Sequence, residues 1–505
     1  MKLQFLALVC LLSIAPALLA DESSRPNVLF IISDDLTTRL GCYGDKQVLS
    51  PNIDSLAARG VRFKSAYCQY PLCGPSRNSM LCGLYPDSTG IIRNAEIFRD
   101  TIPQRVSLPQ AFRQSGYFAA RIGKLYHYHV PFSVGSNGHD DPDSWEMEIN
   151  PAGCDRLIEQ PDTFTLRKGN FGGTLSWYAS PRPDEQHTDG MMAEDASWVL
   201  ERCAKTKRPF FLAVGFYRPH TPYVAPAKYF EHYLLAEMPV PNDVEADVAD
   251  LPPAALLSHK KEHELLDDDL RRQAIQAYYA STTFMDAQVG KVLNTLRETG
   301  LDRNTIVVFT SDHGYHLGAK GLWQKMSLFE ESAGVPMIIA LPKDDPRSQQ
   351  GGSVCKSPVG LIDLYPTLVD LCDVEVTQEL HGQSLAPMLA DARELGRGYT
   401  ISQVMRGGKS QSFDGYTIRD SRYHLTLWDN GEQGIELYDH QDDPHEKDNL
   451  AVRPGNSKQK TDDPKVLAVI DCLTATLAAE RAMAMPATGR PPVKRIPRIP
   501  HLVSP

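Results

Sequence analysis

The sequence predicts an α/β fold: a large, mainly parallel or mixed sheet sandwiched by helices, followed by a smaller α+β subdomain with an antiparallel sheet. Continuous apolar, β-branched runs alternate with helical periodicity up to about residue 340, a pattern typical of strands buried on both faces. After about residue 390, apolar and polar residues alternate, as in half-exposed strands. We therefore expect a main domain over residues 21–390 and a subdomain over residues 391–485.

Four apolar runs are the expected strands of the main sheet, and helices lie between them. The first helix begins at Ser50-Pro51, where a hydroxyl side chain precedes a proline in the first turn, and Gly60 can end it. A longer helix is expected over residues 271–299, where apolar residues recur near helical spacing. The expected strands are residues 28–32, 210–214, 305–310 and 336–340.

The C-terminal subdomain shows a hairpin pattern. Residues 415–419 and 423–428 alternate between apolar and polar side chains, and Asp-Asn-Gly at residues 429–431 is a turn signal. A helix is expected near residues 464–483. These elements predict an antiparallel sheet with one covering helix.

Three segments have no regular pattern. Residues 131–190 and 236–268 are polar and proline-rich, so we expect irregular surface insertions that shape a site or bind nothing. The tail, residues 486–505, is rich in proline and arginine and is expected to be poorly ordered.

Residues 1–20 have the features of a secretory signal: Lys2, an apolar stretch, and Ala20 before a polar segment. An uncleaved membrane anchor is the alternative, but the apolar stretch is short for a span. No Asn-x-Ser/Thr sequon occurs, so bacterial export fits better than lysosomal sorting. We expect an exported, periplasmic or extracellular protein without stable membrane insertion.

The net charge and the cysteine content limit which partners and metal sites the chain is expected to have. A net charge of −11 argues against nucleic-acid binding and means that an anionic substrate must be attracted by a local basic pocket. Of ten cysteines, Cys10 lies in the signal segment and Cys73 in a separate motif. The even number that remains permits disulfides without requiring them, and the spacings match no zinc pattern.

Two polar pairs follow expected buried strands. Asp34-Asp35 comes after the strand at residues 28–32, and Asp312-His313 after the strand at residues 305–310. Ligands of open α/β sheets bind at this edge, and converging carboxylates repel one another unless a cation lies between them. Oxygen ligands favour a hard divalent ion, best Ca²⁺. Turn chemistry is the alternative for Asp34-Asp35 taken alone.

Cys73 stands in the pentapeptide Cys-x-Pro-Ser-Arg, which ends at Arg77. If Cys73 opens a helix, as Pro75 allows, Arg77 lies one turn further on the same face. The N-terminal end of such a helix favours an anion. A chance turn-to-helix sequence is the alternative for this string in isolation.

Together these motifs resemble the type I sulfatases of the alkaline-phosphatase superfamily, and within them the iduronate-2-sulfatase branch. The resemblance covers nearly the whole mature chain. It implies that Cys73 is oxidised to formylglycine by a formylglycine-generating or equivalent enzyme. Besides the pentapeptide, the matching segments include Gly-Cys-Tyr-Gly-Asp at 41–45, Gly-Lys-Leu-Tyr-His at 123–127, Pro-His-Thr-Pro at 219–222, Thr-Ser-Asp-His-Gly at 310–314 and Trp-Gln-Lys at 323–325.

The resemblance also implies the roles of individual residues. The aldehyde hydrate attacks sulfur, His220 or Lys325 protonates the leaving alcohol, and His127 acts as the later base, although His129 is a close alternative to His127 in sequence. The implied Ca²⁺ ligands are Asp34, Asp35, Asp312, His313 and the modified Cys73. The residues implied to surround the sulfate are Arg77, Lys124, His127, His220 and Lys325.

The expected activity is therefore sulfate ester hydrolysis on a sulfated oligosaccharide or polysaccharide, with the 2-O-sulfate of iduronate-type units as the specific expectation. One departure concerns modification: the family usually continues Leu-Thr-Gly-Arg after the core motif, where this chain has Cys82 and Leu84. Two alternatives stay open, a phosphoester or phosphonate hydrolase of the same superfamily, and a non-catalytic glycan-binding protein with unmodified Cys73.

Overall fold

The computed structural model describes residues 25–407, 412–453, 456–486 and 490–491. The expected signal segment, residues 1–20, and most of the expected tail lie outside the described residues. Over the described ranges, no helix combines the length and the apolar character needed to cross a membrane.

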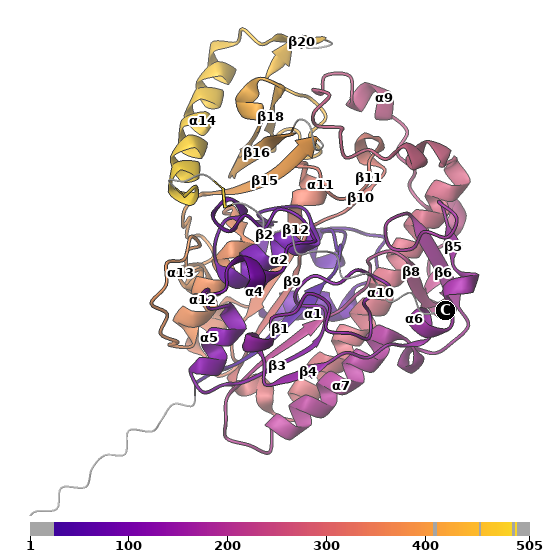
Figure 1. Cartoon of the computed structure of the whole chain (residues 1–505), viewed down its shortest axis with the longest axis vertical. Helices are drawn as coiled ribbons and strands as arrows, with labels where there is room; N and C mark the ends of the chain where they lie inside the picture. The colour runs from indigo at the N-terminus through magenta and orange to yellow at the C-terminus, as the bar shows by residue number, and fades with distance from the viewer. Residues whose placement is uncertain (1–24, 408–411, 454–455, 487–489, 492–505) are drawn as a thin grey trace, which may run out of the picture.

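A mixed sheet forms the centre of the main domain (Figure 1). In spatial order its strands are β13 (Val354–Cys355), β2 (Val61–Tyr67), β12 (Gly334–Ala340), β9 (Thr305–Ser311), β1 (Asn27–Ser33), β7 (Phe210–Gly215), β3 (Phe118–Gly123) and β4 (Met147–Ile149), and β14 (Val359–Gly360) also pairs with β2. β1 is parallel to both β7 and β9, whereas β12 is antiparallel to β9 and β2. The expected strands and the expected fold class are thus confirmed.

Helices cover both faces of this sheet because its strands are apolar on both faces. In β1, Val28 and Phe30 pack into one core, whereas Leu29 and Ile31 pack into the other. The helices of the first core are α2 (Cys73–Cys82), α5 (Leu108–Gln114), α12 (Leu364–Leu371) and α13 (Ala386–Ala390). Those of the second core are α1 (Pro51–Arg59), α7 (Thr188–Cys203) and α10 (Asp268–Glu298).

The C-terminal subdomain is a four-stranded antiparallel sheet with one long helix beside it (Figure 1). Apolar side chains of the sheet and of the helix share one core. The Oγ of Ser402 donates to the backbone carbonyl of Cys68 at 2.5 Å, so the first strand of this sheet lies against the main domain. The elements are β15 (Tyr399–Gly407), β16 (Ser412–Asp420), β17 (Tyr423–Trp428), β18 (Gly434–Asp439) and α14 (Pro464–Ala484).

The insertion at residues 131–190 is more regular than its composition predicts. Its strands join β8 in a small three-stranded sheet of order β5-β6-β8. These elements are too short for a hydrophobic period to be visible in the sequence. They are α6 (Cys154–Leu157), β5 (Phe164–Thr165), β6 (Ser176–Ser180) and, beyond the insertion, β8 (Tyr223–Pro226).

The remaining short elements belong to connections. A small hairpin before β12 carries Lys325 directly after its second strand. These elements are α3 (Pro86–Thr89), α4 (Phe98–Thr101), α8 (Ala227–Phe230), α9 (Val244–Asp247), β10 (His316–Leu317), β11 (Trp323–Gln324), α11 (Glu330–Ala333), β19 (Val452–Arg453) and β20 (Asn456–Lys460).

Two local expectations differ from the structure. The Ser50 side chain does not cap α1; its Oγ accepts from the backbone of Gly41 at 2.9 Å and lies 3.1 Å from Oδ1 of Asp54. Part of the tail contacts the rest of the protein, because Arg490 forms ion pairs with Asp87 and Asp414. Both differences arise from contacts with residues distant in sequence, which local patterns do not encode.

Candidate active site

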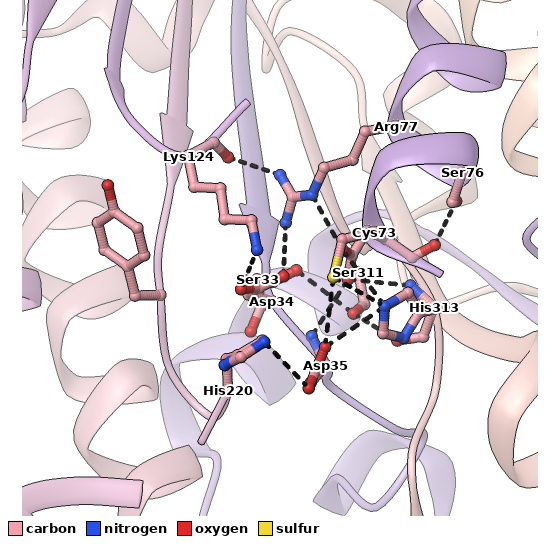
Figure 2. A network of polar contacts seen from close by, with 12 residues as sticks. Ser33, Asp34, Asp35, Cys73, Ser76, Arg77, Lys124, His220, Ser311 and His313 are labelled. Carbon is pink, nitrogen blue, oxygen red and sulfur yellow. Dashed lines mark hydrogen bonds and ion pairs between the residues drawn. The ribbon is translucent and has the colours of Figure 1, made fainter. Parts of the chain in front are cut away.

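The two polar pairs meet at the carboxyl edge of the main sheet, as expected. Ser33 and Ser311 are paired in the parallel register of β1 and β9, so the residues that follow them leave the sheet side by side. The backbone N–H of Asp35 donates to Oδ1 of Asp312 at 3.1 Å. Asp35 itself has a φ of 65°, a conformation that is uncommon for a residue with a side chain. Figure 2 shows the resulting cluster.

Cys73 opens helix α2, so the N-terminal end of a fully buried helix points at this cluster (Figure 2). The Cys73 Sγ lies 3.3 Å from Nε2 of His313, 3.3 Å from Nζ of Lys325 and 3.9 Å from Oδ1 of Asp35. The predicted helix and its placement of Arg77 one turn further are therefore observed.

Arg77 is completely buried and bridges the two acidic pairs. Its Nε donates to Oδ2 of Asp312 at 2.9 Å and its Nη2 to Oδ1 of Asp34 at 3.1 Å. Its Nη1 donates to the backbone carbonyls of Lys124 and Leu125. Every nitrogen of the guanidinium group is thus used within the protein, so Arg77 fixes the carboxylates around Cys73.

Two lysines reach the cluster from separate elements. Lys124 directly follows β3, and its Nζ lies 2.6 Å from Oδ2 of Asp34. Lys325 follows β11, and its Nζ lies 2.6 and 2.9 Å from the two carboxylate oxygens of Asp35. Both ammonium groups therefore lie on the Cys73 side of the cluster, where they can neutralise an anion.

The two candidate histidines, His127 and His220, also lie at this cluster, beside Cys73 and Asp35 respectively. His220 Nε2 is 3.8 Å from Oδ2 of Asp35, and its Nδ1 lies 2.6 Å from the carbonyl of Thr221. Burial lowers the pKa of His127 to about 4, although the nearby Cys73 side chain acts in the opposite direction. A neutral His127 at pH 7 has the protonation state that a base requires.

The electrostatics favour negative charge at position 73. Burial raises the pKa of the Cys73 thiol, but Lys124, Lys325 and His313 together bring this pKa well below its ordinary value. Burial likewise raises the pKa of Asp34, and Lys124 is the main group that lowers it below its ordinary value. A strongly shifted thiol in a buried cationic environment is typical of a functional site.

The donor set fits a divalent cation. One atom each from Asp35, Cys73, Asp312 and His313 lies within 4.8 Å of the others, and all four residues are buried. His313 Nδ1 lies 2.9 Å from the carbonyl of Gly314, so this nitrogen can carry a proton. Its Nε2 faces the Sγ of Cys73 at 3.3 Å and Oδ1 of Asp35 at 3.4 Å and so points into the donor group. Three of the four donors are the oxygen or imidazole atoms that divalent ions accept, and Asp34 adjoins them.

Two further residues at the site are not among the predicted site residues, although Gln324 lies within the Trp-Gln-Lys motif. Lys260 lies in the insertion at residues 236–268, and its Nζ donates to the carbonyl of Gly173 at 2.6 Å. Gln324, the neighbour of Lys325, donates to the same carbonyl at 3.4 Å. Burial lowers the pKa of Lys260, and Lys325 and Asp35 are among the charges that act on it. Both insertions therefore contribute to the surroundings of Lys325.

The loop that carries Lys325 is fixed at both ends by Glu446 of the C-terminal subdomain. Lys320 donates from Nζ to the Glu446 carbonyl at 2.5 Å, and the Glu330 N–H donates to Oε2 of Glu446 at 2.9 Å. Between these points Gln324 has a φ of 112°, an unusual conformation that packing must maintain. A residue more than one hundred positions away thus helps to place Lys325.

This chain has Cys82 and Leu84 where the family pattern has threonine and arginine, and another arginine lies close to this position in the structure. Arg105 donates to the Cys82 carbonyl at the C-terminal end of α2, through Nε at 2.9 Å and Nη2 at 2.6 Å. A cation at this end of a helix stabilises it. Arg105 therefore supplies a positive charge near the place where the family pattern has an arginine.

The sequence left open whether the cysteines form disulfides, and in the described residues they do not. All nine cysteines from Cys42 to Cys472 are unpaired, and seven of them are buried in addition to the partly buried Cys42. No disulfide therefore contributes to the described part of the fold.

Comparisons with known proteins identify two family models and several relatives that this chain resembles. Residues 26–374 match the family model "Sulfatase", and residues 318–468 match "N-sulphoglucosamine sulphohydrolase, C-terminal". A "Sulfatase" of Formosa agariphila is 33% identical over 477 residues, covering 91% of this chain and 89% of that protein. "Iduronate 2-sulfatase" of Mus musculus is 33% identical over 387 residues, covering 69% of each chain.

A solved structure shares the fold at lower identity. The phosphonate monoester hydrolase of Agrobacterium radiobacter superposes with a TM-score of 0.73 at 21% identity, covering 94% of this chain and all of that one. At this identity the likeness concerns the architecture alone.

Proposed function

This chain belongs to the sulfatase family and is a sulfuric ester hydrolase, and we propose that it removes the 2-O-sulfate of iduronate-type units in glycosaminoglycans or a related sulfated polysaccharide. The observation that carries the proposal is the convergence of Lys124, Lys325, His127 and His220 around Cys73. The likeness to an iduronate 2-sulfatase over 69% of the chain supports the choice of sugar.

We propose that Cys73 is converted to formylglycine by a modifying enzyme and that Asp34, Asp35, Asp312 and His313 hold Ca²⁺ beside it. The buried donor set and the orientation of His313 Nε2 toward Cys73 and Asp35 support the metal. The aldehyde hydrate would supply the nucleophile and a second hydroxyl for sulfate release, and Ca²⁺ would supply positive charge for the sulfate oxygens.

The chain's own residues perform the remaining tasks. Arg77 holds Asp34 and Asp312 in position, so the cluster needs no rearrangement when substrate binds. Lys124 and Lys325 neutralise the sulfate oxygens. His220 or Lys325 protonates the leaving alcohol, and His127, neutral at pH 7, removes a proton from the position-73 side chain so that sulfate leaves.

Lys260 gives the proposal a basis for choosing a sugar. Its ammonium group lies on an insertion beside Gln324 and Lys325, outside the group of residues that surrounds the sulfate. We propose that it pairs with the carboxylate of the uronic acid whose 2-O-sulfate is cleaved. A charge-assisted hydrogen bond of this kind is worth roughly 1.5–3 kcal/mol.

Further proposals concern the rest of the chain. Residues 1–20 act as a signal for export to the periplasm or the exterior, which the apolar stretch after Lys2 supports. Residues 21–390 form the catalytic domain, residues 391–485 the C-terminal subdomain, and residues 486–505 a tail. The contacts of Glu446 support an active role of the subdomain in placing Lys325.

The test compares substrates on one preparation in which mass spectrometry has measured the conversion of Cys73. We expect rapid sulfate release from an unsaturated or iduronate disaccharide with a 2-O-sulfate, and slow release when the only sulfate is on the glucosamine 6-O. Faster release from the 6-O-sulfated sugar would overturn the choice of sugar. Faster hydrolysis of a phosphate or phosphonate monoester would favour the phosphoester alternative instead.

The modification is tested separately. A Cys73 peptide from a host that possesses the modifying enzyme is expected to carry an aldehyde in place of the thiol. Its mass should fall accordingly, because oxygen replaces sulfur and two hydrogens are lost. Retention of the thiol, together with glycan binding but no turnover, would favour the non-catalytic alternative.

A further inference from the structure

Outside the active site, one group of side chains that could hold a metal ion contains a cysteine. Cys154 is the first residue of α6, Glu159 follows that helix, and His187 directly precedes α7. One ligand atom of each lies within 4.8 Å of the others, and all three residues are buried. None of them takes part in the proposed sulfate chemistry.

Several polar atoms of this group have no partner within the protein. His187 is 0% exposed, and within the described residues neither of its ring nitrogens has a hydrogen-bond partner; Oε2 of Glu159 lacks one as well. Buried polar atoms are normally hydrogen-bonded, and an orphaned set that converges on one point indicates a missing ligand. A bound cation would satisfy one ring nitrogen of His187 together with Oε2 of Glu159.

The backbone around the group is rigid. Gly153 approaches the chain at residues 186–188 so closely that a Cβ would lie 2.3 Å from the Thr188 nitrogen. The Gly153 N–H donates to Thr188 Oγ1 at 2.9 Å, and Asp155 accepts from both the Thr188 N–H and its hydroxyl. These contacts hold Cys154 beside His187 before any ligand binds.

Glu159 is oriented in a similar way. The Ser180 hydroxyl donates to its Oε1 at 2.5 Å, and Arg182 lies 3.4 Å from the same oxygen. The other oxygen, Oε2, is left free for a ligand. Each of the three side chains therefore has a fixed backbone or neighbour, and the Cys154 thiol contacts Glu159 directly.

We propose that Cys154, Glu159 and His187 bind a zinc ion, with water or the second Glu159 oxygen completing the coordination. A thiolate with an imidazole and a carboxylate is a typical zinc donor set and is softer than the oxygen-rich set expected to hold Ca²⁺. Burial, Glu159 and Asp155 raise the pKa of the Cys154 thiol to about 12, so metal binding must displace its proton.

The zinc site would support the segment that carries His220. Asp155, the neighbour of Cys154, forms a buried ion pair with Arg218. Asp189, two residues after His187, accepts the backbone N–H groups of Tyr217 and Arg218 at 3.0 and 2.9 Å. His220 follows two residues later. Zinc binding is therefore expected to stabilise the chain and to influence the position of His220.

The test measures metal directly. The full chain is stripped with chelator, reloaded with Ca²⁺ and Zn²⁺ and desalted, and its zinc is counted by mass spectrometry. We expect one zinc per intact chain and none in Cys154→Ser or His187→Gln. Cys203→Ser is the matched control, because Cys203 is also a buried free thiol, at the last residue of α7, and it should retain one zinc.

A spectroscopic measurement on the Cys73→Ser chain separates the two sites, because among the described residues Cys154 is then the thiol that remains in a group able to hold a metal. Co²⁺ should give a thiolate-to-cobalt charge-transfer band that Zn²⁺ abolishes. Absence of this band, or equal zinc in Cys154→Ser and Cys203→Ser, would overturn the proposal. If the ligand variants do not fold, the cobalt spectrum alone decides.

Discussion

The Nε of Arg77 donates to Oδ2 of Asp312 at 2.9 Å, and both side chains are completely buried. The same guanidinium group reaches Asp34, so one cation orders the carboxylates that follow two different strands. Its position in the sequence, four residues after Cys73, predicts that it faces the site. The structure shows that its nitrogens are used by the protein itself.

Arg77→Lys is therefore expected to weaken the proposed Ca²⁺ site. Lysine cannot donate to both carboxylates and two carbonyls at once, and a broken buried ion pair costs roughly 3–5 kcal/mol. We expect a lower calcium affinity, measured by calorimetry, together with a lower kcat. Arg113→Lys, on the surface of α5, should leave both unchanged. Normal calcium affinity in Arg77→Lys would contradict this role.

Cys73→Ser should abolish turnover. Removing a covalent nucleophile from a hydrolase costs about 10³-fold or more, and in a host whose modifying enzyme oxidises only cysteine, a serine at this position lacks the second hydroxyl that expels sulfate. The control is Cys472→Ser, since Cys472 is exposed on α14. Sulfate release by the Cys73→Ser chain at the rate of the control would rule out the proposed nucleophile.

Lys260→Met should raise the KM for a 2-O-sulfated uronate substrate by about tenfold or more, because a charge-assisted hydrogen bond is lost. A substrate analogue without the carboxylate should show no such change. Lys261→Met is the matched control, as Lys261 is the exposed neighbour in sequence. Equal effects on both substrates would assign Lys260 a structural role in place of carboxylate recognition.

Glu446→Gln should lower stability in a pH-dependent manner. Burial raises the pKa of Glu446, but His424 and His440 bring it well below its ordinary value, so this stabilisation is present above about pH 4.5 and is lost on acidification. Burial lowers the pKa of His440, yet Glu446 raises it above its ordinary value, so the pairing is complete below about pH 6.5 and fades above the raised pKa.

The difference in melting temperature between the native chain and Glu446→Gln should therefore be largest between about pH 5 and 6 and smaller at pH 8. The loss corresponds to roughly 3 kcal/mol, as for other buried pairs that lose one partner. A difference that does not vary with pH would contradict a contribution from His440. Activity should fall as well, because the Glu446 carboxylate accepts the Glu330 N–H at one end of the loop that carries Lys325.

Much of the fold follows from local patterns. Continuous apolar runs such as residues 28–32 identify strands that are buried on both faces, and the residues after them lie at one sheet edge by the rules of α/β topology. The spacing of Cys73 and Arg77 and the shared motifs likewise identify the site. The small sheet within residues 131–190 was not predictable, because its strands are too short to show a period.

The sequence by itself thus determined four adjacent strands of the main sheet, the family and the group of residues around Cys73. The four strands are β12, β9, β1 and β7. Only the tertiary structure decided that Arg77 bridges two aspartates, that Lys260 approaches Lys325, and that Glu446 fixes the Lys325 loop. It also brought Cys154 next to His187, although their spacing matches no zinc pattern. The physical reason is that each of these contacts joins segments distant in sequence, and the packing of the whole core, not any local period, sets the distance between them.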